Sequence, residues 1–265
     1  MLVALFKPVW AYRGFILGAV RRDFQLKYAN SLLGAAWNVL QPLALMVVFT
    51  LVFSQVMRMR LPGVDHPYSF SIYLCAGLFA WNFFAEIATR SQGMFLEYSG
   101  LLKKLSFPRL CLPIVTVLTS LINFGIMMVL FIVFLLITGY FPGPVVLAAI
   151  PVYLILLAFA SGLGVVLGTL NVFLRDIGQL FAIVLNFWFW LTPIVYPIQA
   201  IPEPFGQWLA YNPMTPIVAA LQGVFLHGNM PDWGSLVYPL LVALALCAAG
   251  LYLYVRNAAA IVDEL

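Results

Sequence analysis

Charged residues are the scarcest class in this sequence. Asp, Glu, Lys and Arg make up only 8% of the 265 residues, whereas 64% are hydrophobic. Soluble domains carry about 25% charged and about 45–50% apolar residues. The scarcity of charge therefore excludes a water-soluble globular protein and indicates an integral membrane protein.

Residues that carry chemistry are also few. The three cysteines, Cys75, Cys111 and Cys247, lie inside apolar runs and are interpreted as small hydrophobic residues, so we expect no disulfide framework or metal site. The two histidines, His66 and His227, lie in segments expected outside the membrane. No HExxH or Gly-x-Ser-x-Gly pattern occurs, so the sequence gives no indication of an enzyme.

A phosphate-binding loop for ATP is missing as well. None of the four lysines follows a glycine, so the chain lacks the loop that ends in Gly-Lys-Ser/Thr. We expect no cofactor on this chain, and any ATP and Mg²⁺ would be bound by a partner ATPase. An ion gradient usually requires carboxylates at membrane depth. Glu86 is the one acid clearly inside an expected span, and Arg90 at i,i+4 favours a structural ion pair over a proton relay.

Long charge-free runs predict the membrane spans. A span needs about 20 apolar residues, and in hydrocarbon each segment must pair its own backbone polar groups, which favours helices. The run 110–174 is divided by TGYFPGP at 138–144, whose prolines and glycines predict a turn. The sequence thus predicts an all-α membrane protein with six spans, near 34–56, 69–94, 110–137, 145–171, 178–199 and 235–255.

The charge-free run before the last predicted span is expected not to cross the membrane. Pro204, Pro213 and Pro216 divide it into pieces below spanning length. We predict two short re-entrant helices on the external side, at 204–211 and 215–225, within a re-entrant segment 204–226.

Lysine and arginine predict the orientation. The six predicted spans place 11 of the 13 lysines and arginines on the same side of the membrane as the two termini. Only Arg58 and Arg60 lie on the other side. Because positive residues concentrate on the cytoplasmic side, both termini are predicted to be cytoplasmic.

Residues 1–27 are predicted to form an amphipathic helix on the inner leaflet. Apolar residues share one arc of a helical wheel, while most basic residues lie opposite. Two interpretations stay open: a simple topology anchor, or a site for an anionic lipid-linked substrate. The basic residues concerned are Arg13, Arg21, Arg22 and Lys27.

Six stretches, spread over almost the whole chain, resemble the membrane subunits of ABC-2-type exporters, specifically the O-antigen, capsule and teichoic-acid polysaccharide permeases. They are LKYANSLLGAAWNVLQPLALMVVFTLVFS (26–54), LFAWNFFAE (78–86), LLKKLSFPRLCLP (101–113), LGTLNVFLRDIGQL (167–180), FWFWLTPIVYP (187–197) and YNPMTPIV (211–218). Ser106 departs from the pattern, because the family commonly has an aromatic residue there.

The resemblance implies a single ABC-2 transmembrane domain over 1–265 that exports an undecaprenyl-diphosphate-linked polysaccharide across a bacterial inner membrane. It implies a homodimer with two copies of a separate ABC ATPase, surrounded by membrane lipids and with no nucleic acid partner. One alternative is an ABC-2 exporter of a small lipophilic compound or lipid. A more remote one is a membrane-embedded glycan-modifying enzyme.

Two further sets of site residues follow from the resemblance. A short cytoplasmic helix over 97–105, ended by the Phe107-Pro108 pair, is expected to dock into the ATPase; Asp176 is expected either to contact the ATPase or to cap the next helix. The ATPase-coupling residues are Glu97, Lys103, Lys104, Arg109, Arg175 and Asp176. Aromatic rings match the apolar faces of sugars, although packing or interface anchoring is the commoner role for any one ring. The candidate polysaccharide channel residues are Trp37, Trp81, Phe84, Trp188, Trp190 and Tyr196.

Overall fold

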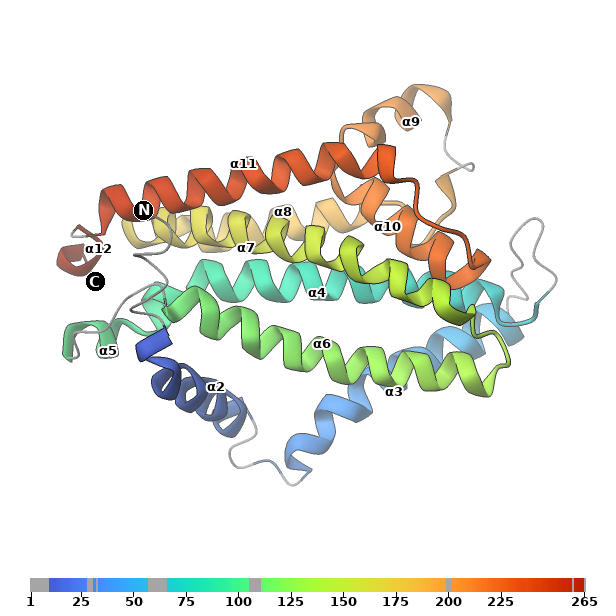
Figure 1. The fold of residues 1–265 in the computed structure, drawn as a ribbon, viewed down its shortest axis with the longest axis horizontal. Helices are drawn as coiled ribbons and strands as arrows, with labels where there is room; N and C mark the ends of the chain where they lie inside the picture. Colours follow the sequence, from blue (N-terminus) through green and yellow to red (C-terminus); the bar gives the residue numbers. More distant parts are fainter. Residues whose placement is uncertain are drawn as a thin grey trace.

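The computed structural model describes residues 10–27, 31, 33–56, 66–104, 111–198, 202–258 and 260–264, and these ranges contain helices and turns without a strand. Figure 1 shows the helices as an elongated bundle. They are α2 (Arg13–Lys27), α3 (Trp37–Phe49), α4 (Ser69–Glu97), α5 (Ser99–Lys104), α6 (Cys111–Ile137), α7 (Ala149–Phe173), α8 (Asp176–Trp190), α9 (Glu203–Ala210), α10 (Met214–Gln222), α11 (Trp233–Asn257) and α12 (Ala260–Glu264).

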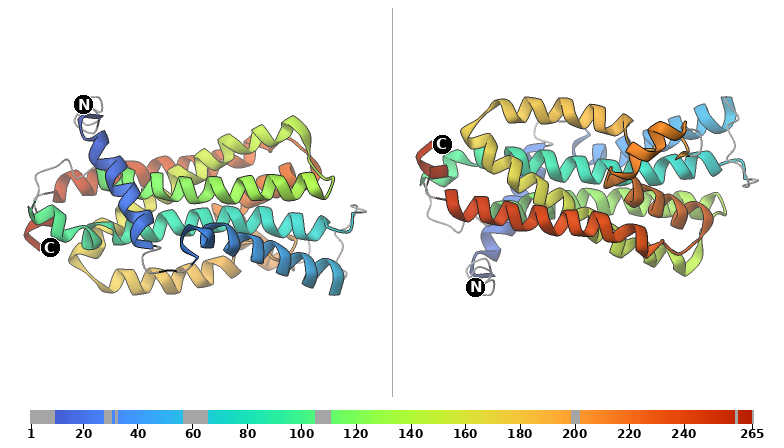
Figure 2. Two further views of the ribbon diagram at one scale, coloured as in Figure 1. Left: turned by 90° about the horizontal axis from the view of Figure 1, so that it is seen from below. Right: turned by 90° about the horizontal axis from the view of Figure 1, so that it is seen from above.

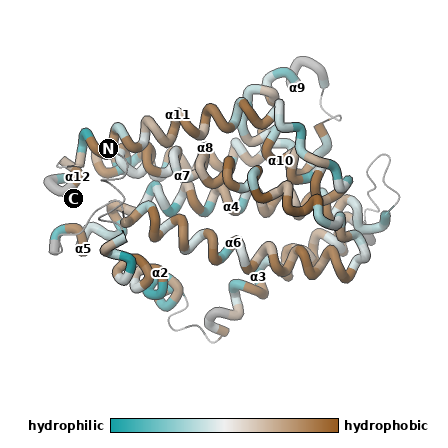
Figure 3. The backbone as a smooth tube through the Cα atoms, in the orientation of Figure 1, coloured by the Kyte–Doolittle hydropathy of each residue, from teal (hydrophilic) through white to brown (hydrophobic). Residues whose placement is uncertain are grey.

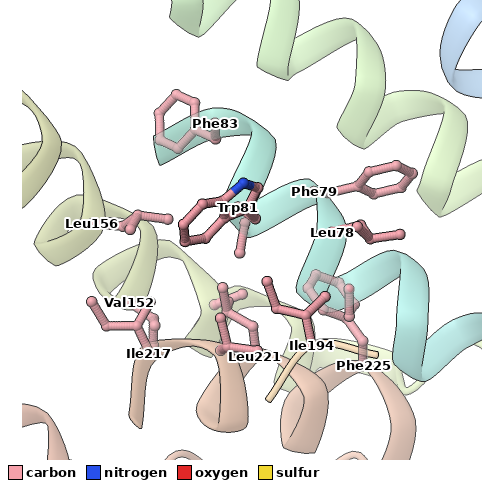
Figure 4. Packing of buried hydrophobic residues seen from close by; sticks show 14 of the residues in the cluster. Leu78, Phe79, Trp81, Phe83, Val152, Leu156, Ile194, Ile217, Leu221 and Phe225 are labelled. Atoms are coloured by element: carbon pink, nitrogen blue, oxygen red, sulfur yellow. The ribbon is translucent and has the colours of Figure 1, made fainter. Parts of the chain in front are cut away.

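Helix α4 forms the centre of the bundle. It packs against α6 on one side and α7 on another, and α7 in turn packs against α11. Apolar side chains of α4, α7 and α10 form the core, among them Leu78 of α4, Leu156 of α7 and Leu221 of α10 (Figure 4). An apolar helix that is covered on most sides must lie inside a bundle. The remaining face of α4 carries polar residues, which is unusual for a helix at the centre of an apolar bundle.

Glycines let α7 approach both of its neighbours closely. A Cβ atom on Gly162 would lie 2.7 Å from the backbone nitrogen of Cys247 in α11, and one on Gly168 would lie 2.5 Å from the carbonyl oxygen of Ser91 in α4. Side chains larger than hydrogen would separate these helices. Small residues at helix contacts are typical of membrane bundles, where close van der Waals packing replaces the hydrophobic effect.

Within the described ranges, four helices are long and apolar enough to cross a membrane: Ser69–Glu97, Cys111–Ile137, Gly143–Phe173 and Trp233–Asn257. The third combines α7 with the 3-10 turn Gly143–Ala148 that precedes it. In Figure 3 hydrophobic colour dominates α6, α7 and α11, whereas α4 and α2 alternate between hydrophobic and hydrophilic colour. Three further apolar helices are shorter: Trp37–Phe53, Asp176–Trp190 and Met214–His227.

The structure corrects the predicted span over 178–199. Helix α8 begins at Asp176 and ends at Trp190, and the residues that follow form turns. Pro193 and Pro197 lack the backbone N–H that a continuing helix needs, which explains the early end. The sequence favoured a longer helix because no charge interrupts this run.

The two ends of the bundle differ. Figure 1 places α2, α5, α12 and the turn between α7 and α8 at one end, and α9 and α10 at the other. Helix α10 continues into a π-helical turn, Gly223–His227, that ends at Gly228, where φ is +61°. The segment with internal prolines thus forms two short helices, α9 and α10.

Helix α2 lies against the protein through part of its apolar arc. Ile16, Ala19 and Val20 are buried and form a cluster with Cys111 and Val115 of α6. Residues 1–9, the first part of the predicted interfacial helix, lie outside the described residues. Helix α2 therefore packs on the bundle through its apolar residues, and its arginines remain exposed.

Candidate functional site

A polar cavity of about 540 Å³ lies between the end of α2 and helices α3, α4 and α6. On α4, Asn82, Glu86 and Thr89 line it, and their spacing places them on one face of the helix. The other polar lining residues are Lys27, Asn38, Gln41, Arg90 and Asn123. Polar and ionisable groups inside a membrane bundle are costly, and so they mark functional sites.

The predicted ion pair between Glu86 and Arg90 is confirmed. Arg90 Nε donates to Glu86 Oε1 at 3.0 Å, and Asn123 Nδ2 donates to the same oxygen at 2.5 Å. Arg90 Nη1 also lies 4.0 Å from Asp23 Oδ2. The guanidinium is therefore shared between two carboxylates, one of which comes from the interfacial helix.

Asp23 is a site residue that sequence reasoning missed. Tyr98 Oη donates to Asp23 Oδ1 at 2.6 Å, and Thr119 Oγ1 donates to Asp23 Oδ2 at 3.4 Å. Burial, followed by the hydrogen bond to Asp23, raises the pKa of Tyr98 above its usual range, so the phenol keeps its proton. The spacing of residues in the sequence could have indicated this role. Asp23 follows Ile16 by seven residues, about two helical turns, and so lies on the buried face of α2.

A second cavity, of about 290 Å³, lies between α4 and α8 and is lined by Gln92, Asn186, Phe189 and other residues. Thr89 lines both cavities. Helices α3 and α8 flank α4 on the same side of the molecule (Figure 2). The polar face of α4 is thus a strip between α3 and α8, which we call the α4 strip: Asn82, Glu86, Thr89 and Arg90.

Asn171 fixes the end of α7 next to this strip. Its Nδ2 donates to the carbonyl oxygen of Gln92 at 3.3 Å, and its Oδ1 accepts a bond of 3.1 Å from the backbone N–H of Gly178. The expected capping role of Asp176 is wrong in detail, because Asp176 is the first residue of α8 and Arg175 occupies the cap position. Asp176 still places negative charge at the positive end of the helix dipole.

The aromatic candidates divide into buried and exposed rings. Phe84 has no exposed surface. The centre of its ring lies 5.3 Å from that of Phe159 and 5.2 Å from that of Trp188. Phe84 is therefore enclosed by other side chains and does not line a channel wall in this structure. The indole N–H of Trp188, which is half-buried, donates to Asn212 Oδ1 at 2.9 Å.

The other rings reach a surface. Trp81 is mostly buried but lines the cavity between α4 and α8. Trp37 is 49% exposed and Trp190 is 62% exposed. Tyr196 is half-buried and its hydroxyl donates to the carbonyl oxygen of Trp190 at 2.6 Å.

The coupling candidates lie at the end of the bundle that carries α2 and α12. Glu97 is the last residue of α4, and the short helix begins only at Ser99, so the expected start at residue 97 is wrong. Tyr98 makes the turn between the two helices, because its conformation leaves the helical region. Lys103 of α5 is exposed, Lys104 ends α5, and Arg109 lies outside the described residues. Arg175 and Asp176 are exposed at the turn between α7 and α8.

Of the four basic residues expected to bind lipid diphosphate, Lys27 alone lines the polar cavity, and its Nζ donates to Asn38 Oδ1 at 3.1 Å. Arg13, Arg21 and Arg22 are exposed on α2, and the Arg13 guanidinium lies 5.6 Å from the centre of the Trp10 ring. Within the described ranges, no three His, Cys, Asp or Glu side chains come together as a metal site requires.

Comparison with known proteins identifies the family of this chain. Residues 16–226 match the model of the ABC-2 type transporter family. The chain is 30% identical to the O-antigen export system permease protein RfbA of Klebsiella pneumoniae over 219 residues, which cover 82% of each chain. It is 30% identical to RfbA of Myxococcus xanthus over 233 residues, 87% of each. It is 23% identical to the polysialic acid transport protein KpsM of Escherichia coli over 238 residues, 88% of this chain and 89% of the other.

Proposed function

Because the chain belongs to the ABC-2 type transporter membrane family, we propose that it is the permease subunit of an ATP-driven exporter of a polysaccharide. The relatives that it matches over more than four fifths of their length are named for O-antigen export and polysialic acid transport. The observation that carries the proposal is the α4 strip, a continuous polar face inside an apolar bundle. A hydroxyl-rich polymer needs such a path, whereas a lipophilic substrate does not.

The proposed topology has six spans in one domain over 1–265. In this proposal α3, which continues into the π-helical segment Thr50–Val56, and α8 add two crossings to the four long helices. With six crossings both termini lie on one side, which the positive charges at that end assign to the cytoplasm. Helices α9 and α10 then lie at the external surface as re-entrant elements of an inner-membrane protein.

The proposed assembly is a homodimer with two copies of a separate ATPase. Exposed apolar side chains flank the α4 strip on both sides. They belong to α3 (Val39, Leu40, Leu43, Val47 and Val48) and to α8 (Leu180, Ile183, Val184, Phe187 and Trp190). A second copy related by a two-fold axis would cover these faces and close the open strip into a channel between protomers. Trp37, Trp190 and Tyr196 are then placed to stack on sugars as the polymer passes.

Coupling to the ATPases would use α5 and the turn at Arg175 and Asp176, which share one end of the bundle. Binding of ATP would bring the two ATPases together, move α5 and shift the transmembrane helices. The lipid carrier is proposed to be an undecaprenyl diphosphate whose phosphates meet the exposed Arg13, Arg21 and Arg22 of α2 at the inner leaflet. Arginine suits this role because its planar guanidinium binds phosphate oxygens bidentately.

The deciding experiment is deletion of this chain in its own cell. We expect the long-chain polysaccharide to disappear from the surface and lipid-linked polymer to accumulate inside. A plasmid copy of this chain should restore export in the deletion strain. The same plasmid should not restore export in a strain that also lacks the ATPase partner. An unchanged surface polysaccharide after clean deletion would refute the proposed function.

A further inference from the structure

The charges in and beside the polar cavity between α2, α3, α4 and α6 are balanced. Lys27, Arg90 and Glu86 line the cavity, and Arg90 also contacts Asp23, which lies outside the lining. A diphosphate in this cavity would lie beside Glu86, and the positive charge of Arg90 is already shared between Glu86 and Asp23. The cavity therefore suits a neutral polar ligand better than an anion.

Amide side chains make up most of the remaining polar wall. Asn38, Gln41, Asn82 and Asn123 supply both donors and acceptors, and Thr89 adds a hydroxyl. Asn123 donates to Glu86 and so holds the carboxylate at the cavity wall. Amides that donate and accept, next to a carboxylate that accepts, match ligand hydroxyls, which do both.

Aromatic rings form the apolar part of the wall. Phe83 and Phe124 line the cavity and stack on each other with their centres 4.2 Å apart, and Phe79 lies on the same wall. Flat rings beside amides and a carboxylate match a sugar, which has apolar C–H faces and a rim of hydroxyls that both donate and accept.

We propose that this cavity is a binding subsite for a neutral, hydroxyl-rich sugar unit of the exported polymer. The inference rests on the proposed function and adds to it the place where the protein holds the glycan. The cavity volume, about 540 Å³, lies within the range of ligand sites. Its position, between the end of α2 and the half of α4 that leads to α5, places it on the entry side of the path.

The subsite is tested by direct binding. The probe is a fluorescently labelled short oligosaccharide, released from the surface polysaccharide of the strain that carries the protein. The purified permease with its ATPase, in lipid nanodiscs, should bind it saturably. Asn123→Leu and Gln41→Leu should each raise Kd about tenfold, as expected for one or two hydrogen bonds lost in a desolvated site.

A matched control separates the subsite from general effects of removing an amide. Gln207→Leu makes the same exchange on the exposed surface of α9, at the other end of the bundle, and should leave Kd unchanged. Complex yield should stay normal in all three variants, and Gln207→Leu should also leave basal ATPase activity unchanged. Normal Kd values for both Asn123→Leu and Gln41→Leu would overturn the proposal, as would the absence of oligosaccharide binding to the unsubstituted complex.

Competition distinguishes the sugar from the phosphate of a lipid carrier. Inorganic pyrophosphate should not displace the oligosaccharide. Displacement by pyrophosphate that is lost in Lys27→Ala would identify a phosphate site and overturn the sugar subsite. Neither result affects the deletion experiment, so failure of the subsite and failure of the exporter function remain distinguishable.

Discussion

Asn212 connects three elements through its side chain. Its Oδ1 accepts from the Trp188 indole and from the backbone N–H of Met214, and its Nδ2 donates to Leu191 O and Thr192 Oγ1. One amide therefore fixes the end of α8 to the start of α10. Trp188, one of the candidate sugar contacts, uses its polar group in this arrangement.

We expect Asn212→Ala to destabilise the protein by about 1–3 kcal/mol, because three partly buried hydrogen bonds and one exposed hydrogen bond are lost. Trp188→Phe should cost less, since it removes one donor and keeps most of the ring packing. The unfolding temperature of each variant in detergent, monitored by the loss of monodisperse protein on heating, measures both effects. Equal unfolding midpoints for Asn212→Ala and the unsubstituted protein would contradict the role assigned to this side chain.

At the scale of elements, the contact of α7 with α11 depends on glycine. Helix α7 meets α11 where a methyl group on Gly162 would overlap the Cys247 backbone. Gly125 of α6 offers a control, because a methyl group there meets no atom within 4 Å.

Gly162→Ala should lower the stability of the folded protein, by about 1–3 kcal/mol as is typical of overpacked sites. Gly125→Ala should leave stability unchanged or raise it slightly, because alanine has the higher helix propensity. Folded yield and the unfolding midpoint are the measurements. If both glycines tolerate alanine equally, the close contact between α7 and α11 is not required.

Helix α5 is the element proposed to transmit ATPase movement. We expect Lys103→Glu combined with Lys104→Glu to weaken co-purification of the ATPase at least several-fold, because the reversed charges would repel an acidic groove. Membrane insertion and yield should not change. The control is Lys→Arg at both positions, which keeps the charge and should preserve the complex. Undiminished complex and export with the glutamates would argue against docking at α5.

At the scale of the whole molecule, a single protomer presents an open path. The α4 strip faces outward between α3 and α8, so one copy does not enclose a channel around it. Under the proposed function, export requires assembly with a second copy and with an ATPase.

The purified permease is expected to hydrolyse no ATP by itself, and activity should appear on addition of the separate ATPase. The physical reason is the lack of any lysine that follows a glycine in a phosphate-binding loop. A steady-state phosphate-release assay, with the ATPase alone as reference, measures this. ATP turnover that co-elutes with the isolated permease after repeated chromatography would contradict the prediction.

The sequence by itself determined which segments form the long apolar helices and where positive charge lies along the chain, although it placed the end of α8 too late. Lipid provides no partners for backbone groups, so each charge-free run must become a helix, and prolines such as Pro213 mark where it cannot continue. The Glu86 and Arg90 pair was also predictable, because it is local to one helix.

Only the tertiary structure decided which faces meet. A buried face and a lipid-facing face are both apolar, so hydrophobicity could not tell that Phe84 is enclosed while Trp190 is exposed. The pairing of Asp23 with Tyr98 joins residues 75 positions apart. Contacts of this kind depend on the register between helices that are distant in sequence. Close packing at small residues sets that register, and no local sequence pattern predicts it.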